Sequence, residues 1–247
     1  MKLLKRLGQH ILISKPILKK IINYAEISDK DTVLEVGCGT GNLTEMLLKK
    51  ARKVIGIEKD GRFIDLLEKK FKKEIKESRL ELIEANALKI EWPSFDKFVS
   101  NIPYKISSPL TFKLFKHDYK LAVIMYQKEF AERLTASCGS KKYGKLSVIA
   151  KIYCKAEILD IVPPEAFRPK PKVYSAIVRI IPKPEIDVRN KKLFEDFVRF
   201  VFTKRRKKFG KIAQEYGIMV PDDLKDKRPE EIPPEVFAKI VDDISSV

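Results

Sequence analysis

The sequence predicts an α/β fold with a mostly parallel sheet of the Rossmann-like kind, followed by a small C-terminal helical domain. Short apolar runs alternate with amphipathic segments over most of the chain. A glycine-rich loop follows the first of these runs directly, and the last quarter of the chain has only helical periodicity. Alternating strands and helices favour a parallel sheet with right-handed crossovers and helices on both faces.

Continuous apolar runs of five to seven residues are typical of strands that are buried on both faces. Between the first of them, apolar residues spaced three and four apart predict amphipathic helices. The predicted strands are 32–36, 53–58, 80–85, 97–101 and 120–126, and the predicted helices are 43–51, 62–75 and 128–136.

The second half of the chain changes character. Residues 146–162 and 174–182 lack an intervening helical pattern and predict two longer strands at an antiparallel edge. The proline-rich stretch 182–186 predicts a break. Segments 193–217 and 234–244 beyond it are helical in period. We therefore expect one domain over 1–182 and a small helical domain over 183–247.

The chain is strongly basic. Its 247 residues include 51 Lys and Arg against 34 Asp and Glu, a formal net charge of +17. Such an excess favours a polyanionic partner, with nucleic acid first and an anionic membrane surface second. The alternative is a generally basic protein without such a partner.

Three widely spaced cysteines without a C-x-x-C pair, and only two histidines, support neither a disulfide framework nor a zinc site. The N-terminal residues carry too many charges for a signal peptide, and no apolar run approaches the length of a membrane span. We expect a cytoplasmic protein that binds no metal and no membrane.

The glycine-rich loop EVGCGTGNLT predicts a ligand site. Gly37, Gly39 and Gly41 alternate where a strand turns sharply into a helix, and Glu58 closes the second strand, where this fold places a carboxylate on a ribose. The acidic Glu35 and the lack of a phosphate-binding lysine favour a cationic nucleoside cofactor, S-adenosylmethionine. The alternative is a tight connection with no ligand.

The stretch NIPY, residues 101–104, lies at the end of the fourth strand, on the same sheet edge as the glycines. The side-chain oxygen of Asn101 and the carbonyl of Ile102 are acceptors for an exocyclic amino group. Pro103 stiffens the turn, and Tyr104 offers a stacking face for a base. This arrangement suits a methyltransferase acting on adenine N6, although a simple turn with a half-buried tyrosine is the other interpretation.

These motifs resemble those of the ribosomal small-subunit RNA adenine N6,N6-dimethyltransferases, especially the archaeal and eukaryotic branch. The resemblance extends over nearly the whole chain: GQHIL, VLEVGCGTGNLT, VIGIEKD, NIPYKISSPL, MYQKEFAERLTASCGSKKYGKLSV, PPEAFRPKPKVYSAIVRIIP, FTKRRKKFGK and RPEEIPPEVF. It implies dimethylation of two adjacent adenosines in the 3′-terminal hairpin loop of small-subunit rRNA, during ribosome assembly, by a monomer.

The resemblance also implies residue roles. His10 and Leu12 would line the cofactor pocket, and Phe167 would face the flipped adenine opposite Tyr104. Asn101 would contact both cofactor and target amine. Asn86 stands where the family usually has an aspartate that holds the cofactor's adenine amino group, so we expect weaker binding there. Lys105 also stands where the family more often has asparagine or glutamine, and Gly210 interrupts the predicted basic helix.

Basic residues near the expected pocket and in the run 203–211 are predicted to contact RNA backbone, with a merely solvated face as the alternative for that run. The predicted contacts are Lys141, Lys142, Lys145, Arg168, Lys170, Lys172, Lys204, Arg205, Arg206, Lys207 and Lys208. Two other functions stay open: a large-subunit rRNA methylase of the macrolide-resistance type, and a non-catalytic RNA-binding assembly factor.

Overall fold

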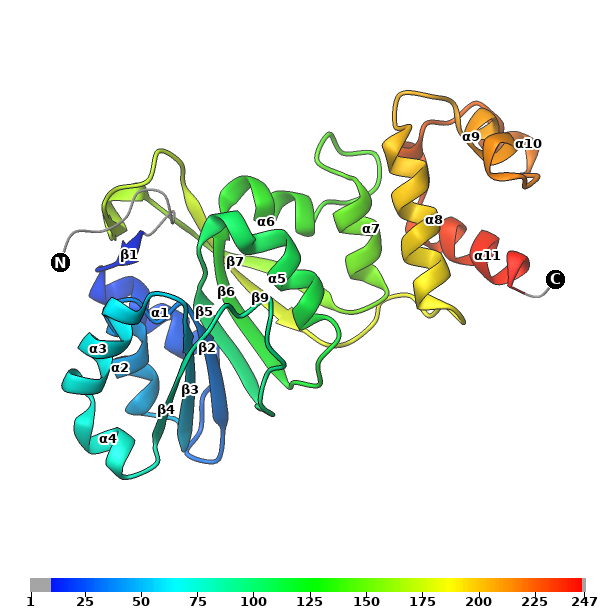
Figure 1. The fold of residues 1–247 in the computed structure, drawn as a ribbon. Coiled ribbons are helices and arrows are strands. Elements are labelled where there is room, and N and C mark those ends of the chain that lie inside the picture. Colours follow the sequence, from blue (N-terminus) through cyan, green and yellow to red (C-terminus); the bar gives the residue numbers. More distant parts are fainter. Residues whose placement is uncertain (1–9, 246–247) are drawn as a thin grey trace. The chain divides into compact units, whose positions relative to one another are not determined.

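The computed structural model describes residues 10–245 (Figure 1). The chain forms two compact units, one of Met1–Ala131 with Glu157–Pro182, the other of Glu132–Ala156 with Lys183–Val247. The second unit thus includes residues 132–156, which the sequence analysis assigned to the first domain. Among the described residues, no helix is both long enough and apolar enough to cross a membrane.

A seven-stranded sheet, counted within residues 10–245, organises the first unit, in the order β4-β3-β2-β5-β6-β9-β7. Its first five strands in that order are parallel to one another, and β9 pairs antiparallel with β6. The strands are β2 (Thr32–Val36), β3 (Lys53–Glu58), β4 (Leu80–Glu84), β5 (Lys97–Asn101), β6 (Leu121–Gln127), β7 (Lys155–Val162) and β9 (Ser175–Ile181). The α/β class and the antiparallel edge are confirmed.

Helices cover both faces of this sheet, which explains why its central strands are apolar throughout. One core cluster joins Val33, Val99 and Val123 of the strands to buried residues of the first three helices. Figure 1 shows α5 against the opposite face. The helices are α1 (Lys15–Tyr24), α2 (Asn42–Leu48), α3 (Gly61–Lys70), α4 (Lys72–Lys76), α5 (Ser107–Leu114) and α6 (Lys128–Leu134).

The predicted helix 62–75 is in fact two helices. Phe71 interrupts it with φ −114° and ψ 31°, ending α3 and preceding α4. Its ring is buried, at 4% exposure. Burial of this one large side chain, rather than helix propensity, therefore sets the bend.

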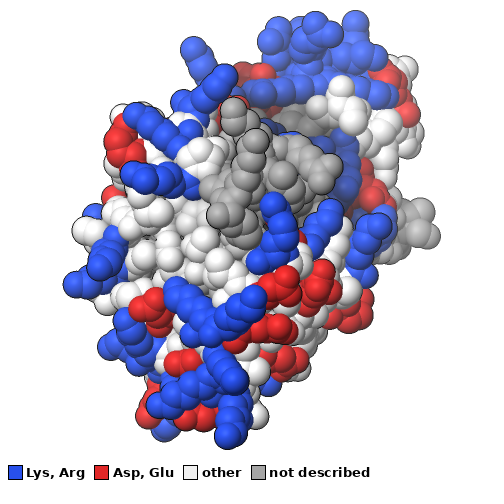
Figure 2. Space-filling view, turned by 60° about the vertical axis from the view of Figure 1, so that its left-hand side comes forward, with Lys and Arg blue, Asp and Glu red and all other residues white. Residues whose placement is uncertain are grey.

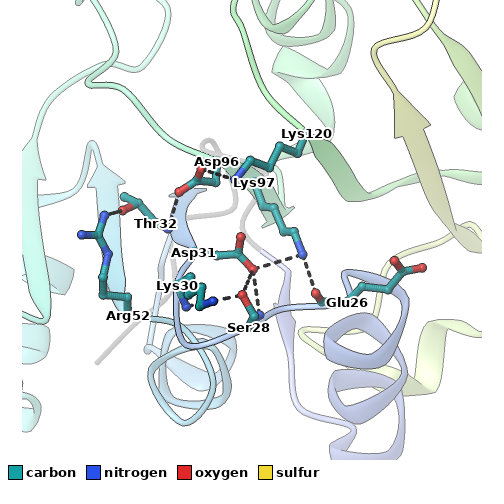
Figure 3. Close-up of polar contacts among 9 residues, drawn as sticks. All are labelled: Glu26, Ser28, Lys30, Asp31, Thr32, Arg52, Asp96, Lys97 and Lys120. Atoms are coloured by element: carbon teal, nitrogen blue, oxygen red, sulfur yellow. Dashed lines mark hydrogen bonds and ion pairs between the residues drawn. The ribbon is translucent and has the colours of Figure 1, made fainter.

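Polar contacts tie the amino ends of the strands together, at the edge opposite the one where the cofactor loop emerges (Figure 3). The buried Lys97 at the start of β5 pairs with Asp31 at 3.1 Å. Asp96 accepts the N–H of Thr32 at 2.8 Å and pairs with Lys120 at 2.8 Å. These side chains link the starts of β2, β5 and β6.

The second unit is helical: α7 (Lys145–Lys151), α8 (Lys191–Thr203), α9 (Phe209–Tyr216), α10 (Asp222–Lys225) and α11 (Pro234–Ile244). Its core is aromatic, with Phe194, Phe197, Phe209 and Phe237 fully buried. Gly210 lies where a Cβ would come within 3.0–3.1 Å of the backbone and side chain of Lys225. Close packing of α9 on α10 thus accounts for this glycine.

Two predictions in this unit are wrong. Residues 146–151 belong to helix α7 rather than a strand, because 146–150 are all buried and a short apolar run does not reveal its period. The basic run does not lie on one continuous helix either: α8 ends at Thr203, residues 204–208 are not helical, and α9 begins at Phe209. The chain turns there so that the N–H of Phe209 bonds the carbonyl of Lys227, at 2.7 Å.

Candidate active site

A cavity of about 280 Å³ lies at the carboxyl ends of the parallel strands. Ligands in open α/β sheets bind at this edge. The ends of β2, β3 and β5, the turn after β4 and residues 10–12 line the cavity. Of the predicted cofactor and catalytic residues, it brings together His10, Leu12, Glu35, Gly37, Gly39, Glu58, Asn86, Asn101, Ile102, Pro103 and Tyr104.

The three glycines of the loop have different tasks. Gly37 and Gly39 line the cavity with φ of +82° and +52°, so both use backbone conformations that other residues rarely adopt. A Cβ on Gly37 would lie 3.3 Å from Cδ of Pro103, which brings the loop close to the NIPY turn. Gly41 is not among the lining residues; a Cβ there would lie 2.7 Å from Leu67 and Phe71. Packing against these two side chains explains this glycine, and its part in cofactor binding stays a prediction.

Backbone N–H groups fix the orientation of the Glu58 carboxylate at the end of β3. Its Oε2 accepts the N–H of Gly39 at 3.0 Å, and its Oε1 accepts those of Lys59 at 2.8 Å and Asp60 at 3.0 Å. A carboxylate has about four acceptor positions. Capacity for a ligand hydroxyl therefore remains on a side chain that the backbone already orients.

Glu35 is the most deeply buried acid of the site, at 1% exposure. Its Oε2 accepts the hydroxyl of Thr44 at 2.6 Å. Burial, with a further contribution from the nearby Glu58, raises the pKa of Glu35 to about 8. The cavity therefore holds a carboxyl group that is mostly protonated at neutral pH and that a cation would ionise.

Asn86, in the turn after β4, uses its Oδ1 to accept the N–H of Leu88 at 3.1 Å. This is an Asx-turn, a common use of asparagine in loops. The hydrogen bond leaves the amide NH₂ as the group with free donors. Asparagine in place of aspartate thus presents a donor, and less acceptor capacity, to the cavity.

Asn101 is oriented by the N-terminal segment. Its Nδ2 donates to the carbonyl of His10 at 3.1 Å, and Oδ1 has no donor among the residues the structure describes. The His10 ring stacks on Tyr104, with centroids 5.6 Å apart and planes inclined by 26°, and its Nδ1 lies 2.7 Å from the carbonyl of Pro169. His10 thereby holds two residues of the NIPY stretch at once.

Tyr104 is fixed at its other end. Its hydroxyl lies 2.6 Å from Oγ of Ser175, the first residue of β9, and burial raises its pKa above the usual value. Sequence reasoning missed Ser175, because the two residues lie 71 positions apart and only the sheet brings them together. Likewise, Asn42 donates from Nδ2 to the carbonyl of Leu12 at 2.9 Å, fixing the N-terminal segment to the glycine loop.

Phe167 is a buried residue of the core cluster. It lies in β8 (Phe167–Arg168), which pairs with β1 (Ile11–Leu12), and its ring is 2% exposed within the core cluster. The ring is therefore not exposed to the cavity in this structure, and its role opposite the adenine stays a prediction. His10 is the aromatic ring that stacks on Tyr104.

Most of the predicted RNA-contacting cations are already paired within their own unit. Lys204 and Lys207 both pair with Glu215, whose pKa they lower to about 2, and Arg205 pairs with Glu230 at 3.4 Å. Lys208, Lys142 and Lys170 pair with Asp226, Glu132 and Glu165. Within residues 10–245, Lys141, Lys145, Arg168, Lys172 and Arg206 have no acidic partner.

Lys and Arg nevertheless cover more of the face drawn in Figure 2 than Asp and Glu do. Surface ion pairs of this kind contribute about 0–1 kcal/mol each, so a phosphate can replace the carboxylate at little cost. The basic surface thus keeps its capacity for a polyanion, and the five cations without an acidic partner are the readiest contacts.

A parallel sheet, a glycine loop followed by an acidic second strand, and Asn-Ile-Pro-Tyr at the same edge together define a Rossmann-like methyltransferase. The family model for ribosomal RNA adenine dimethylase matches residues 1–219. The chain belongs to this family. The predicted enzyme class, an S-adenosylmethionine-dependent ribosomal RNA adenine dimethyltransferase, is thereby confirmed.

Relatives and solved structures agree with this assignment. A probable ribosomal RNA small subunit methyltransferase A of Pyrococcus furiosus is 47% identical over 85% of this chain and 75% of its own length. One from Methanosarcina barkeri is 41% identical over 96% of this chain and 86% of its own. Both are archaeal, as the sequence predicted.

Among solved structures, a dimethyladenosine transferase from Plasmodium falciparum superposes with a TM-score of 0.83 at 35% identity, covering 96% of this chain and 98% of its own. The 23S rRNA methyltransferase ErmE superposes with a TM-score of 0.71 at 24% identity, over 95% and 99% of the two chains. The second likeness shows the shared fold alone.

Proposed function

We propose that this chain dimethylates N6 of two adjacent adenosines in the 3′-terminal hairpin loop of small-subunit rRNA, as a monomer on an assembling ribosomal particle. Relatives at 40–47% identity that carry the name small subunit methyltransferase support the choice of subunit. The observation that carries the proposal is the amide of Asn101, anchored at Nδ2 by His10 and left with Oδ1 available beside Tyr104.

The cavity suits S-adenosylmethionine in shape and in chemistry. Gly37 and Gly39 leave room for a ligand beside the backbone, and Glu58 is positioned as an acceptor for ribose hydroxyls. Glu35 supplies a buried acid that complements a cation. When bound, the cofactor supplies an electrophilic methyl group on a positively charged sulfur.

The chain's own part in the reaction is to orient the target amine. Adenine N6 is a weak nucleophile because its lone pair is delocalised into the ring. In the first transfer, acceptors at Asn101 Oδ1 and the Ile102 carbonyl would bind both N6 protons, favour a pyramidal nitrogen and direct its lone pair into the cavity. The methylated, positively charged nitrogen would then lose a proton to water, and its one remaining proton would be bound in the same way for the second transfer. Positioning and stabilisation of the developing charge are the main contributions an enzyme makes to such a transfer.

Tyr104 would hold the base itself, and Pro103 would keep this tyrosine in place. Tyr104, fixed by Ser175 at its hydroxyl, presents a ring of set orientation for stacking. Pro103, with φ −59°, stiffens the turn between the acceptors and this ring. A base reaches the cavity only when flipped out of its stack, which the basic surface assists by binding the phosphates on either side.

Methyl transfer from tritiated cofactor to undermethylated small or large ribosomal subunits tests the proposal. We expect labelling of the small subunit only, recovered as N6,N6-dimethyladenosine at two adjacent positions. Labelling of large subunits would instead indicate the macrolide-resistance type. Cofactor binding without labelling of either would indicate a non-catalytic assembly factor.

Replacing Asn101 with alanine tests the mechanism. We expect turnover to fall at least about 100-fold, as happens when a group that acts in the transition state is removed, while affinity for RNA stays unchanged. Asn101→Asp is the matched control: it keeps an acceptor but loses the donor to His10. An Asn101→Ala enzyme that turns over at the wild-type rate would remove this role.

A further inference from the structure

Residues 172–174 form an exposed segment directly before strand β9. Val173 is 45% exposed and Tyr174 is 53% exposed, whereas most large apolar side chains of the described residues are buried. Single exposed apolar residues are common on protein surfaces. Two in succession, one of them aromatic, are worth explaining when they adjoin a binding site.

Ser175 connects this exposed segment to the candidate active site. Ser175 follows Tyr174 in the chain, is fully buried, and bonds the Tyr104 hydroxyl through its Oγ at 2.6 Å. Consecutive Cα atoms are about 3.8 Å apart, so the backbone of Tyr174 lies one residue from the serine that holds the base-stacking tyrosine. The carbonyl of Tyr174 accepts the N–H of Lys128 at 2.9 Å, so its backbone is anchored while its ring stays exposed.

The positive charge around the exposed segment 172–174 complements the phosphates of a nucleic acid. Lys172 is exposed and precedes Val173 directly, and Arg168 is exposed four residues earlier. Neither has an acidic partner among the described residues. An exposed aromatic ring beside such cations is the combination with which proteins bind single-stranded nucleic acid, because every base has a face on which to stack.

We propose that Tyr174, together with Val173, forms a second stacking site, which binds the base of a nucleotide adjacent to the target adenosine. This inference rests on the proposed function, since it concerns the RNA that enters the same site. Lys172 and Arg168 would contact the phosphates of that nucleotide.

The second site has a physical purpose. Flipping the target adenosine removes a stacking partner from its neighbour. A ring that stacks on the neighbour replaces the lost contact and holds the strand open. Because stacking does not depend on base identity, the site would act on strand geometry rather than sequence.

The test compares Tyr174→Ala, Tyr174→Phe and, as matched control for an exposed apolar residue elsewhere on the sheet, Ile161→Ala. The probes are an RNA hairpin with the loop sequence, and versions in which each nucleotide flanking the target is made abasic in turn. We expect Tyr174→Ala to bind the intact hairpin roughly 5- to 100-fold more weakly, with Tyr174→Phe and Ile161→Ala close to wild type.

Coupling gives the decisive result. If Tyr174 stacks on a flanking base, wild type loses affinity for one abasic hairpin, and Tyr174→Ala shows no further loss on that hairpin. Losses that multiply independently, or a Tyr174→Ala protein that binds within twofold of wild type, would overturn the proposal. An unchanged unfolding midpoint and unchanged cofactor affinity would exclude a folding defect.

Failure of the proposed function would look different. The wild-type chain could label no small-subunit rRNA while Tyr174→Ala still loses affinity and couples to an abasic position. This result would support the stacking site and refute the proposed substrate. If wild type labels small subunits and Tyr174→Ala does so equally well with equal affinity, only the stacking site is refuted.

Discussion

The substitution Glu35→Gln should change how cofactor binding depends on pH. With a pKa of about 8, the buried carboxyl is ionised in only about a tenth of molecules at pH 7. A cationic cofactor beside it favours the ionised form, so binding releases a proton below pH 8. We therefore expect the affinity of the wild type for S-adenosylmethionine to rise up to about tenfold per pH unit between pH 6 and 8, and to level off above 8.

The Glu35 carboxyl affects stability in the opposite direction to cofactor affinity: stability falls as the pH rises. The folded-state pKa lies above the unfolded value of 4.5, so between these two values the folded chain holds a proton that the unfolded chain has released. The contribution to stability is fully present below pH 4.5 and is lost as pH rises through 8. Without ligand, this group should therefore lower the free energy of unfolding by up to about 1.4 kcal/mol per pH unit over that range.

Glu35→Gln removes both dependences while keeping the shape of the side chain and an acceptor for the Thr44 hydroxyl. Calorimetric titration with the cofactor and urea unfolding, each between pH 5 and 9, measure them. The exposed Glu68→Gln is the matched control and should behave as wild type. Wild-type affinity that does not vary with pH, or an equal slope in Glu35→Gln, would refute the reasoning.

Three further predictions concern other parts of the molecule. Asn86→Asp should raise cofactor affinity about fivefold, because a carboxylate accepts the N–H of Leu88 and still has a charged acceptor for a ligand amino group. Titration calorimetry measures this affinity, and equal affinity of variant and wild type would contradict the prediction. Gly41→Ala should destabilise the protein by about 1–3 kcal/mol in urea unfolding, through its left-handed φ and contacts at 2.7 Å, while the cofactor affinity of the folded protein stays near wild type. Arg206→Gln should lower the slope of log affinity for RNA against log salt by about 1, whereas Lys207→Gln, which removes a cation already paired with Glu215, should change it less; equal changes would mean that the ion pair opens on binding.

The residues that line the cavity were largely predictable because their places depend on local order in the chain. A strand that turns through alternating glycines needs few neighbours to define it, and an acid at the end of the next parallel strand lies at the same sheet edge by topology alone. Gly37, Gly39, Glu58 and Asn101 accordingly line one cavity. The family resemblance added the N-terminal segment, since nothing in the local pattern around His10 indicates that it folds onto the site.

The errors arose where distant contacts decide the structure. Residues 146–150 are all buried, so their apolar run has no visible period, and the helix that they form packs against α8. Phe167 was predicted to face the base, and its burial in the core cluster, beside the strand that pairs with it, was not visible in the sequence. In the basic run, Glu215 pairs with both Lys204 and Lys207, which the charge count of the run does not indicate.

The sequence by itself determined the fold class, the order of its strands along the chain, the cofactor edge and the family, because periodicity and closely spaced motifs encode each of them. The tertiary structure decided which of those residues meet and how they are held. Asn101 presents its oxygen because a carbonyl 91 positions away binds its amide, and Tyr104 is fixed by a serine 71 positions away. Such contacts depend on the folded path of the backbone, which no local pattern specifies.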